Sequence, residues 1–97
     1  VGVDMTFGIG YTDDIDQARE AIISIAIKNP LVLKAPEMLV AVSELADSSV
    51  NFIVRPWCKS EHYWDVYFYF HENVKNEFDK RSIGIPFPQM DVHMFKN

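Results

Sequence analysis

The sequence predicts an α+β fold with the ferredoxin-like order β-α-β-β-α-β, in which two helices cover one face of an antiparallel sheet. Three patterns support this prediction. Apolar residues alternate with small or polar ones at the amino terminus, two segments carry apolar residues at helical spacing, and two strand-like runs lie between those segments. A short additional strand is expected near the carboxyl terminus.

The first strand is expected between Val1 and Tyr11, where every second residue is apolar. Thr12 or Asp13 then suits the N-cap of a helix that starts near residue 13, because acidic residues follow where the helix dipole favours them. This helix should end before Pro30. Its expected core stripe has spacings of three and four residues and consists of Ile15, Ala18, Ile22, Ile25 and Ala26.

Ile23 and Ile27 fall outside that stripe and form a second apolar row on the first helix. The row widens the hydrophobic arc beyond what contact with one sheet requires. It predicts either a peripheral part of the core or a lateral contact with another subunit.

Two strands are expected at 38–45 and 50–57, joined around Ala46, Asp47 and Ser48. Pro56 falls within the second run and cannot donate to a strand ladder. It therefore predicts that this strand lies at a sheet edge or contains a bulge.

A second helix is expected from about Glu61 to Arg81, with Ser60 as its cap. Its predicted core row is Tyr63, Val66, Tyr67, Phe70, Val74 and Phe78. Trp64 and Phe68 form a separate row four residues apart. This row is expected either to cover the sheet edge or to make a lateral contact with a neighbouring subunit.

The carboxyl-terminal segment begins with Pro86 and Pro88, which impose a rigid, non-helical backbone. Apolar and polar side chains then alternate, which predicts a short strand at the terminus. We expect this strand to pair with other subunits, because a terminal strand leaves unpaired backbone groups. Its residues are Met90, Asp91, Val92, His93, Met94 and Phe95.

The composition predicts one globular domain that spans residues 1–97. The chain is 48% hydrophobic and 24% charged, and its length suits a single modest core. A net charge of −5 with nine Lys and Arg argues against a nucleic-acid surface. No apolar run approaches the roughly 20 residues that a membrane span needs. The single cysteine, Cys58, excludes an intramolecular disulfide.

Several segments, in this order and spacing, resemble the C-terminal cytoplasmic domain of bacterial small-conductance mechanosensitive channels. The resemblance covers roughly residues 5–95. It rests on the stretches Gly8-Ile9-Gly10-Tyr11-Thr12-Asp13-Asp14-Ile15-Asp16, Pro30 to Lys34, Ser48-Ser49-Val50-Asn51-Phe52, Tyr63-Trp64-Asp65-Val66 and Pro86-Phe87-Pro88-Gln89-Met90-Asp91-Val92.

This resemblance implies a domain cut from a longer membrane protein of the bacterial inner membrane, with the domain on the cytoplasmic side. Family members assemble as a ring of seven identical subunits. Their domains enclose a vestibule through which ions and small solutes pass without tight binding, and membrane tension opens the pore on hypo-osmotic shock. The resemblance implies roles in subunit assembly and solute filtering, and no enzymatic activity.

The chain departs from the family at Ser82, where a glycine usually ends the last helix before the Ile-x-Ile-Pro motif. A serine in a left-handed C-cap costs on the order of 1 kcal/mol relative to glycine. We therefore expect either a displaced helix end or a left-handed Gly84.

No cofactor or metal is expected. The candidate metal ligands Cys58, His62, His71 and His93 lack the paired spacing of structural zinc sites. Cys58 with a histidine lacks an oxyanion-forming turn, so a catalytic pair is not predicted. The Gly8-Ile9-Gly10 stretch lacks the other residues of a phosphate loop.

Domains with two other functions can have this same topology. One is a free-standing regulatory domain that senses a small ligand at a dimer edge. The other is an RNA-binding sheet with aromatic stacking residues, which the negative charge disfavours. Hydrophobic spans encoded upstream of this chain would favour the channel, whereas a complete soluble gene would favour the regulatory domain.

Overall fold

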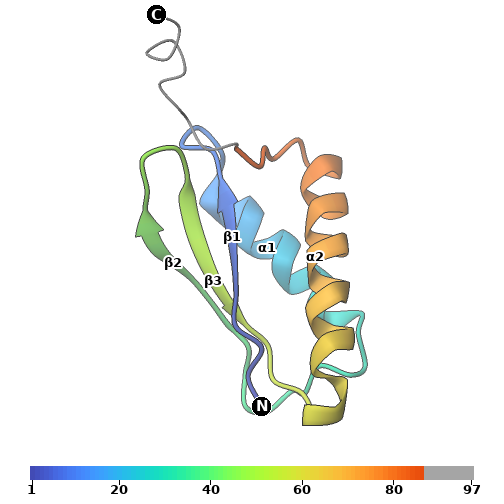
Figure 1. Cartoon of the computed structure of the whole chain (residues 1–97). Coiled ribbons are helices and arrows are strands. Elements are labelled where there is room, and N and C mark those ends of the chain that lie inside the picture. Colours follow the sequence, from blue (N-terminus) through green and yellow to red (C-terminus); the bar gives the residue numbers. More distant parts are fainter. Residues whose placement is uncertain (87–97) are drawn as a thin grey trace, which may run out of the picture.

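The computed structural model describes residues 1–86. Its elements are β1 (Met5–Ile9), α1 (Ile15–Ile27), β2 (Leu39–Leu45), β3 (Val50–Arg55) and α2 (Tyr63–Lys80), with a 3-10 turn at Ser60–His62 before α2. Both helices cover the same face of one sheet (Figure 1). The predicted α+β, ferredoxin-like class is confirmed. The predicted terminal strand at residues 90–95 lies outside the described residues.

The three strands have the order β1-β3-β2, and both neighbouring pairs are antiparallel. Strands β1 and β2 therefore run parallel, with β3 between them, as in a split βαβ unit. The prediction that Pro56 places its strand at an edge or in a bulge was wrong, because β3 is the central strand and the register shift of the sheet lies in β2, between Val42 and Glu44. β3 ends at Arg55, so the missing N–H of Pro56 removes no ladder hydrogen bond, and the Pro56 carbonyl accepts a hydrogen bond from Val3 N at 2.9 Å.

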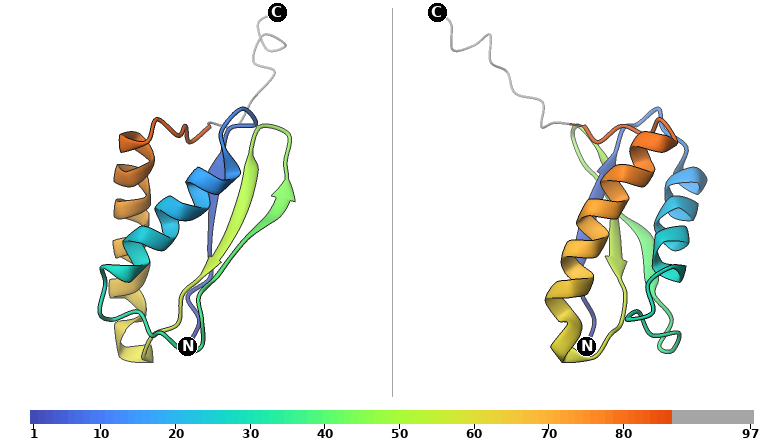
Figure 2. Two further views of the ribbon diagram at one scale, coloured as in Figure 1. Left: turned by 180° about the vertical axis from the view of Figure 1, so that it is seen from behind. Right: turned by 90° about the vertical axis from the view of Figure 1, so that its right-hand side faces the viewer.

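Figure 2 shows the sheet and the two helices as separate layers, and the buried core residues come from β1 and β3 on one side and from α1 and α2 on the other. β1 and β3 contribute alternate buried residues, and Phe7 pairs with Phe52 across the two strands. Because side chains alternate between the faces of a strand, one face of each strand supplies the core. The expected eleven-residue strand is shorter in the structure: Gly2 forms only an isolated bridge with Trp57, and Tyr11 is exposed.

α1 begins slightly later than expected, because its N-cap is Asp14 and not Thr12 or Asp13. The Asp14 carboxylate accepts hydrogen bonds from Asp16 N at 2.8 Å and Gln17 N at 3.1 Å. Asp13 instead accepts a hydrogen bond from Gly10 N at 2.8 Å and closes the preceding turn.

The core stripe of α1 also needs correction at two positions. Ile15 lies in the first turn and is 39% exposed, and Ala21, which was not predicted, is buried. The buried residues are Ala18, Ala21, Ile22, Ile25 and Ala26.

α2 contributes the predicted core row, of which Val66, Phe70, Val74 and Phe78 are buried. Tyr63 and Tyr67 are only partly buried. Ser60 does not cap a helix with its side chain; it opens the 3-10 turn instead.

Polar contacts join α2 to α1 at two positions along α2. The Tyr69 hydroxyl donates a hydrogen bond to Ile25 O at 2.6 Å, and burial raises the pKa of this hydroxyl. At the carboxyl end of α2, the guanidinium of the C-cap residue Arg81 lies 2.9 Å from the Glu77 carboxylate and 3.0 Å from the Glu20 carboxylate of α1. These contacts fix the relative position of the two helices.

The carboxyl end of α2 has the hydrogen bonds of a Schellman motif. Ile83 N donates to Phe78 O at 2.8 Å, and Ser82 N donates to Asp79 O at 3.2 Å. Ser82 has φ = 58°, and no glycine among the described residues has a positive φ. The expectation of a displaced helix end or a left-handed Gly84 was therefore wrong: Ser82 itself adopts the left-handed conformation.

Candidate functional site

One candidate surface is an aromatic pair on α2. Trp64 is 59% exposed and Phe68 is 62% exposed, although both are large apolar side chains. Their ring centroids are 5.7 Å apart and their planes differ by 27°, so the two rings stack. Tyr67 contacts both rings edge-on. The result is a pre-ordered aromatic surface, a feature that is common at protein interfaces.

The position of this pair follows from the helical period. Tyr69 faces α1 and Phe70 is fully buried in the core. At 3.6 residues per turn, Trp64 projects away from the side of α2 that carries Tyr69. The large exposed fractions of Trp64 and Phe68 show that nothing in residues 1–86 covers them. Their predicted contact with a neighbouring subunit stays a prediction.

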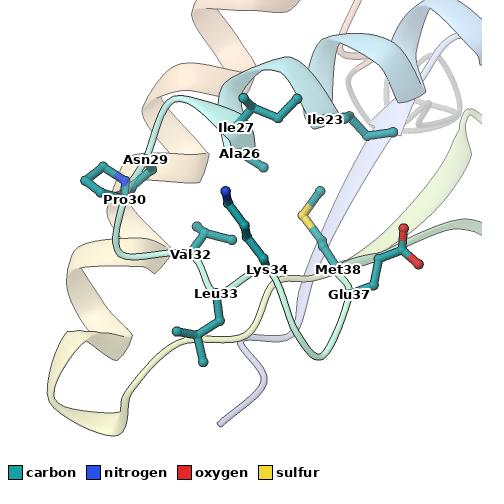
Figure 3. A pocket seen from close by; sticks show the side chains of 10 residues that line it. All are labelled: Ile23, Ala26, Ile27, Asn29, Pro30, Val32, Leu33, Lys34, Glu37 and Met38. Carbon is teal, nitrogen blue, oxygen red and sulfur yellow. The ribbon is translucent and has the colours of Figure 1, made fainter.

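The second candidate surface is a groove between α1 and the connection that leads to β2. It has a volume of about 700 Å³, and both Ile23 and Ile27 lie along it (Figure 3). The structure thus brings these two predicted residues together, with exposed fractions of 39% and 79%. Their lateral subunit contact stays a prediction. The lining residues are Ile23, Ala26, Ile27, Asn29, Pro30, Val32, Leu33, Lys34, Glu37 and Met38.

The connection keeps its shape through its own hydrogen bonds. Leu31 N donates to the Asn29 side chain at 2.9 Å, and Val32 N donates to Asn29 O at 3.1 Å. Leu33 N donates to Trp57 O at 2.8 Å, which ties the connection to the segment after β3. Sequence reasoning missed this groove; the apolar run at 31–33 that follows the Ile23 and Ile27 row is the signal that could have indicated it.

The residues considered for metal or nucleophilic chemistry do not form a site in the described part of the chain. Residues 1–86 contain no cluster of three or more His, Cys, Asp or Glu side chains that could hold a metal ion. Cys58 is buried, and burial raises the pKa of its thiol, which disfavours the thiolate. His71 lies against Tyr67 and Phe7 instead. His93 lies beyond residue 86.

None of the helices within residues 1–86 combines the length and apolar character required to cross a membrane. The described part of the chain offers two exposed apolar surfaces, one on α2 and one along α1.

The family model for the C-terminal part of the mechanosensitive ion channel MscS matches residues 3–85. The chain belongs to this family. The family prediction made from the sequence is confirmed, and the match covers every helix and strand described above. MscS proteins are channels, a non-enzymatic class.

Individual MscS relatives agree with this assignment. An uncharacterised MscS family protein of Synechocystis is 43% identical over 94 residues, which is 97% of this chain and 32% of that protein. The small-conductance mechanosensitive channel of Edwardsiella ictaluri is 37% identical over 94 residues, covering 97% of this chain and 33% of that channel.

A solved structure carries the same MscS fold. The crystal structure of Helicobacter pylori MscS in a closed state superposes with a TM-score of 0.86 and 27% identity, over 94% of this chain and 36% of that chain. This chain therefore spans about a third of the length of the MscS proteins that it matches.

Proposed function

We propose that this MscS domain forms the wall of a cytoplasmic vestibule in a small-conductance mechanosensitive channel that releases ions and small solutes on hypo-osmotic shock. The observation that carries the proposal is the match of residues 3–85 to the C-terminal part of MscS. The high structural similarity to Helicobacter pylori MscS supports it. The full-length protein would lie in the bacterial inner membrane, with this domain on its cytoplasmic side.

The domain contributes to assembly with identical subunits, which form a heptamer in this proposal. Trp64 and Phe68 are stacked and exposed in the monomer. A neighbouring chain that covers them stabilises the assembly, because it removes apolar surface from water. The predicted strand at residues 90–95 adds a second contact, because terminal strands from several subunits can satisfy one another's backbone hydrogen bonds.

The vestibule filters solutes without binding them tightly. The net charge of −5 biases the local concentration of ions around the domain.

The proposal is tested with the full-length gene that encodes this chain. Expressed in a bacterial strain without mechanosensitive channels, the protein should restore survival after a sudden drop in osmolarity. A matched control carries a frameshift before the codon for Val1, so that upstream segments are present without this domain. Normal membrane insertion of the full-length protein without rescue would contradict the proposed function.

The assembly role has its own test. In the full-length protein, Val92→Pro removes one backbone donor from the predicted terminal strand. The solubilised particle should then lose mass or dissociate at lower detergent concentration than the wild type. An unchanged mass and stability would contradict a role for residues 90–95 in assembly.

A further inference from the structure

We propose that the groove between α1 and the 28–38 connection binds a single-chain anionic amphiphile of the medium-chain carboxylate class. In this arrangement the alkyl chain lies along Ile23 and Ile27, and the carboxylate lies on the Lys34 ammonium. The proposal concerns a site on this chain alone and does not rest on the vestibule function.

The apolar part of the site comes from two facing walls. Ile23 and Ile27 lie one helical turn apart on α1, while Val32 and Met38 come from the connection (Figure 3). The volume of about 700 Å³ falls within the range of about 300–1,000 Å³ that is typical of small-molecule sites. Ile27 is 79% exposed without a ligand, so an alkyl chain along this wall would remove apolar surface from water.

The backbone of the connection favours an alkyl chain over a peptide segment. The N–H groups of Leu31, Val32 and Leu33 already donate to Asn29 or Trp57. An incoming peptide would find these three N–H groups already bonded and would bring its own amide groups against the apolar side chains of Ile23 and Ile27, which costs free energy. An alkyl chain brings no such groups.

The charge of the ligand follows from Lys34. Its side chain extends between Val32 and Met38 toward α1, as Figure 3 shows. Within residues 1–86, no carboxylate lies within ion-pair distance of this ammonium. Glu37 also lines the groove, but its carboxylate points away on the far side of Met38. The unpaired Lys34 ammonium next to the apolar walls of the groove therefore complements a ligand that has one carboxylate on an alkyl chain.

Isothermal titration calorimetry on the 97-residue chain tests the charge of the ligand. Decanoate and decyltrimethylammonium, both used below their critical micelle concentrations, have alkyl chains of nine and ten carbons and head groups of opposite charge. We expect one decanoate per chain and at least fivefold weaker binding of the cation, against the bias of the chain's net charge of −5. Octanoate should bind about tenfold more weakly than decanoate, because two methylene groups are lost.

Three variants locate the site. Lys34→Met keeps an unbranched side chain that is one atom shorter and removes its charge, and it should weaken decanoate binding about fivefold. Ile27→Glu places a carboxylate on the apolar wall and should weaken binding at least tenfold. Phe68→Glu is the matched control, because it makes the same kind of change at an exposed apolar position outside the groove, and it should bind decanoate like the parent chain.

Thermal melting and sedimentation of the same samples separate the alternatives. If Lys34 only stabilises the carboxyl end of α1, Lys34→Met lowers the melting temperature and leaves decanoate affinity unchanged, which overturns the proposal. Equal affinity for both charged amphiphiles, or no binding of decanoate, also overturns it. The proposal is also wrong if the groove is a contact between two copies of this chain. In that case the parent chain is dimeric and binds no decanoate, and Ile27→Glu makes it monomeric.

Discussion

Replacing Ser82 by glycine should stabilise the domain, because Ser82 is held in the left-handed backbone region at φ = 58°. This conformation costs a residue with a β-carbon about 1–2 kcal/mol. Glycine avoids that cost but loses about 0.4–1 kcal/mol through its greater freedom in the unfolded chain. The net gain expected from Ser82→Gly is about 1 kcal/mol in unfolding free energy, which corresponds to about 4–8 °C in melting temperature for a domain of this size.

Gly84 provides the matched control for this substitution. It has no positive φ, and a β-carbon at this position would come no closer than 3.8 Å to Asp13 Oδ2. Gly84→Ala should therefore be neutral or stabilise by up to about 1 kcal/mol, through the unfolded state alone.

Urea denaturation of the parent chain and both variants, followed by circular dichroism, measures the two effects. If Gly84 were the left-handed residue in solution, Gly84→Ala would destabilise the domain and Ser82→Gly would not stabilise it. That pair of results would refute the assignment of the Schellman motif to Ser82.

Four further changes test other contacts. Asp14→Ala removes the N-cap of α1 and should lower the unfolding free energy by about 1 kcal/mol in the same urea assay. Phe70→Ala, at a fully buried position, should cost about 3–5 kcal/mol, and retention of parent stability would contradict the packing of α2. The hydrogen bond from Arg81 lowers the pKa of Glu77, so this carboxylate stabilises the fold above its unfolded pKa of about 4.3 and loses that contribution as pH falls through the folded pKa. Glu77→Gln should consequently flatten the dependence of stability on pH below about pH 5, as measured by melts across pH. Trp64→Ala should change the stability of the isolated domain by less than about 1 kcal/mol, because the ring is largely exposed, yet weaken the oligomer of the full-length protein in a mass measurement.

The sequence predicted most helices and strands correctly, because their apolar residues recur with the period of a helix or a strand. The α2 core row was predicted because Val66, Phe70, Val74 and Phe78 keep strict helical spacing. The buried face of β1 was predicted for the same reason, since its alternation matches the pleat of a strand.

The errors arose where tertiary context decided the outcome. Pro56 suggested an edge strand, but β3 ends one residue before it and is the central strand. Ser82 occupies a conformation that its own preference opposes, because the Schellman hydrogen bonds and the burial of Ile83 outweigh that preference. The groove was missed because its walls come from α1 and a non-repetitive connection, so no single periodic pattern contains it.

The surfaces on α2 and α1 were predicted in part. The rows Trp64–Phe68 and Ile23–Ile27 were identified by their spacing, and the structure shows that both rows remain exposed. Their contacts with neighbouring chains or ligands stay predictions, because the periodicity of one chain does not encode its partners.

Patch recording of the full-length protein that contains this chain, reconstituted in liposomes under controlled suction, tests the central claim most directly. The proposed function predicts ion currents that appear only as membrane tension rises and that close when suction is released. Protein that is correctly inserted and oligomeric but passes no current at any tension up to membrane rupture would contradict the claim that this domain belongs to a tension-gated channel.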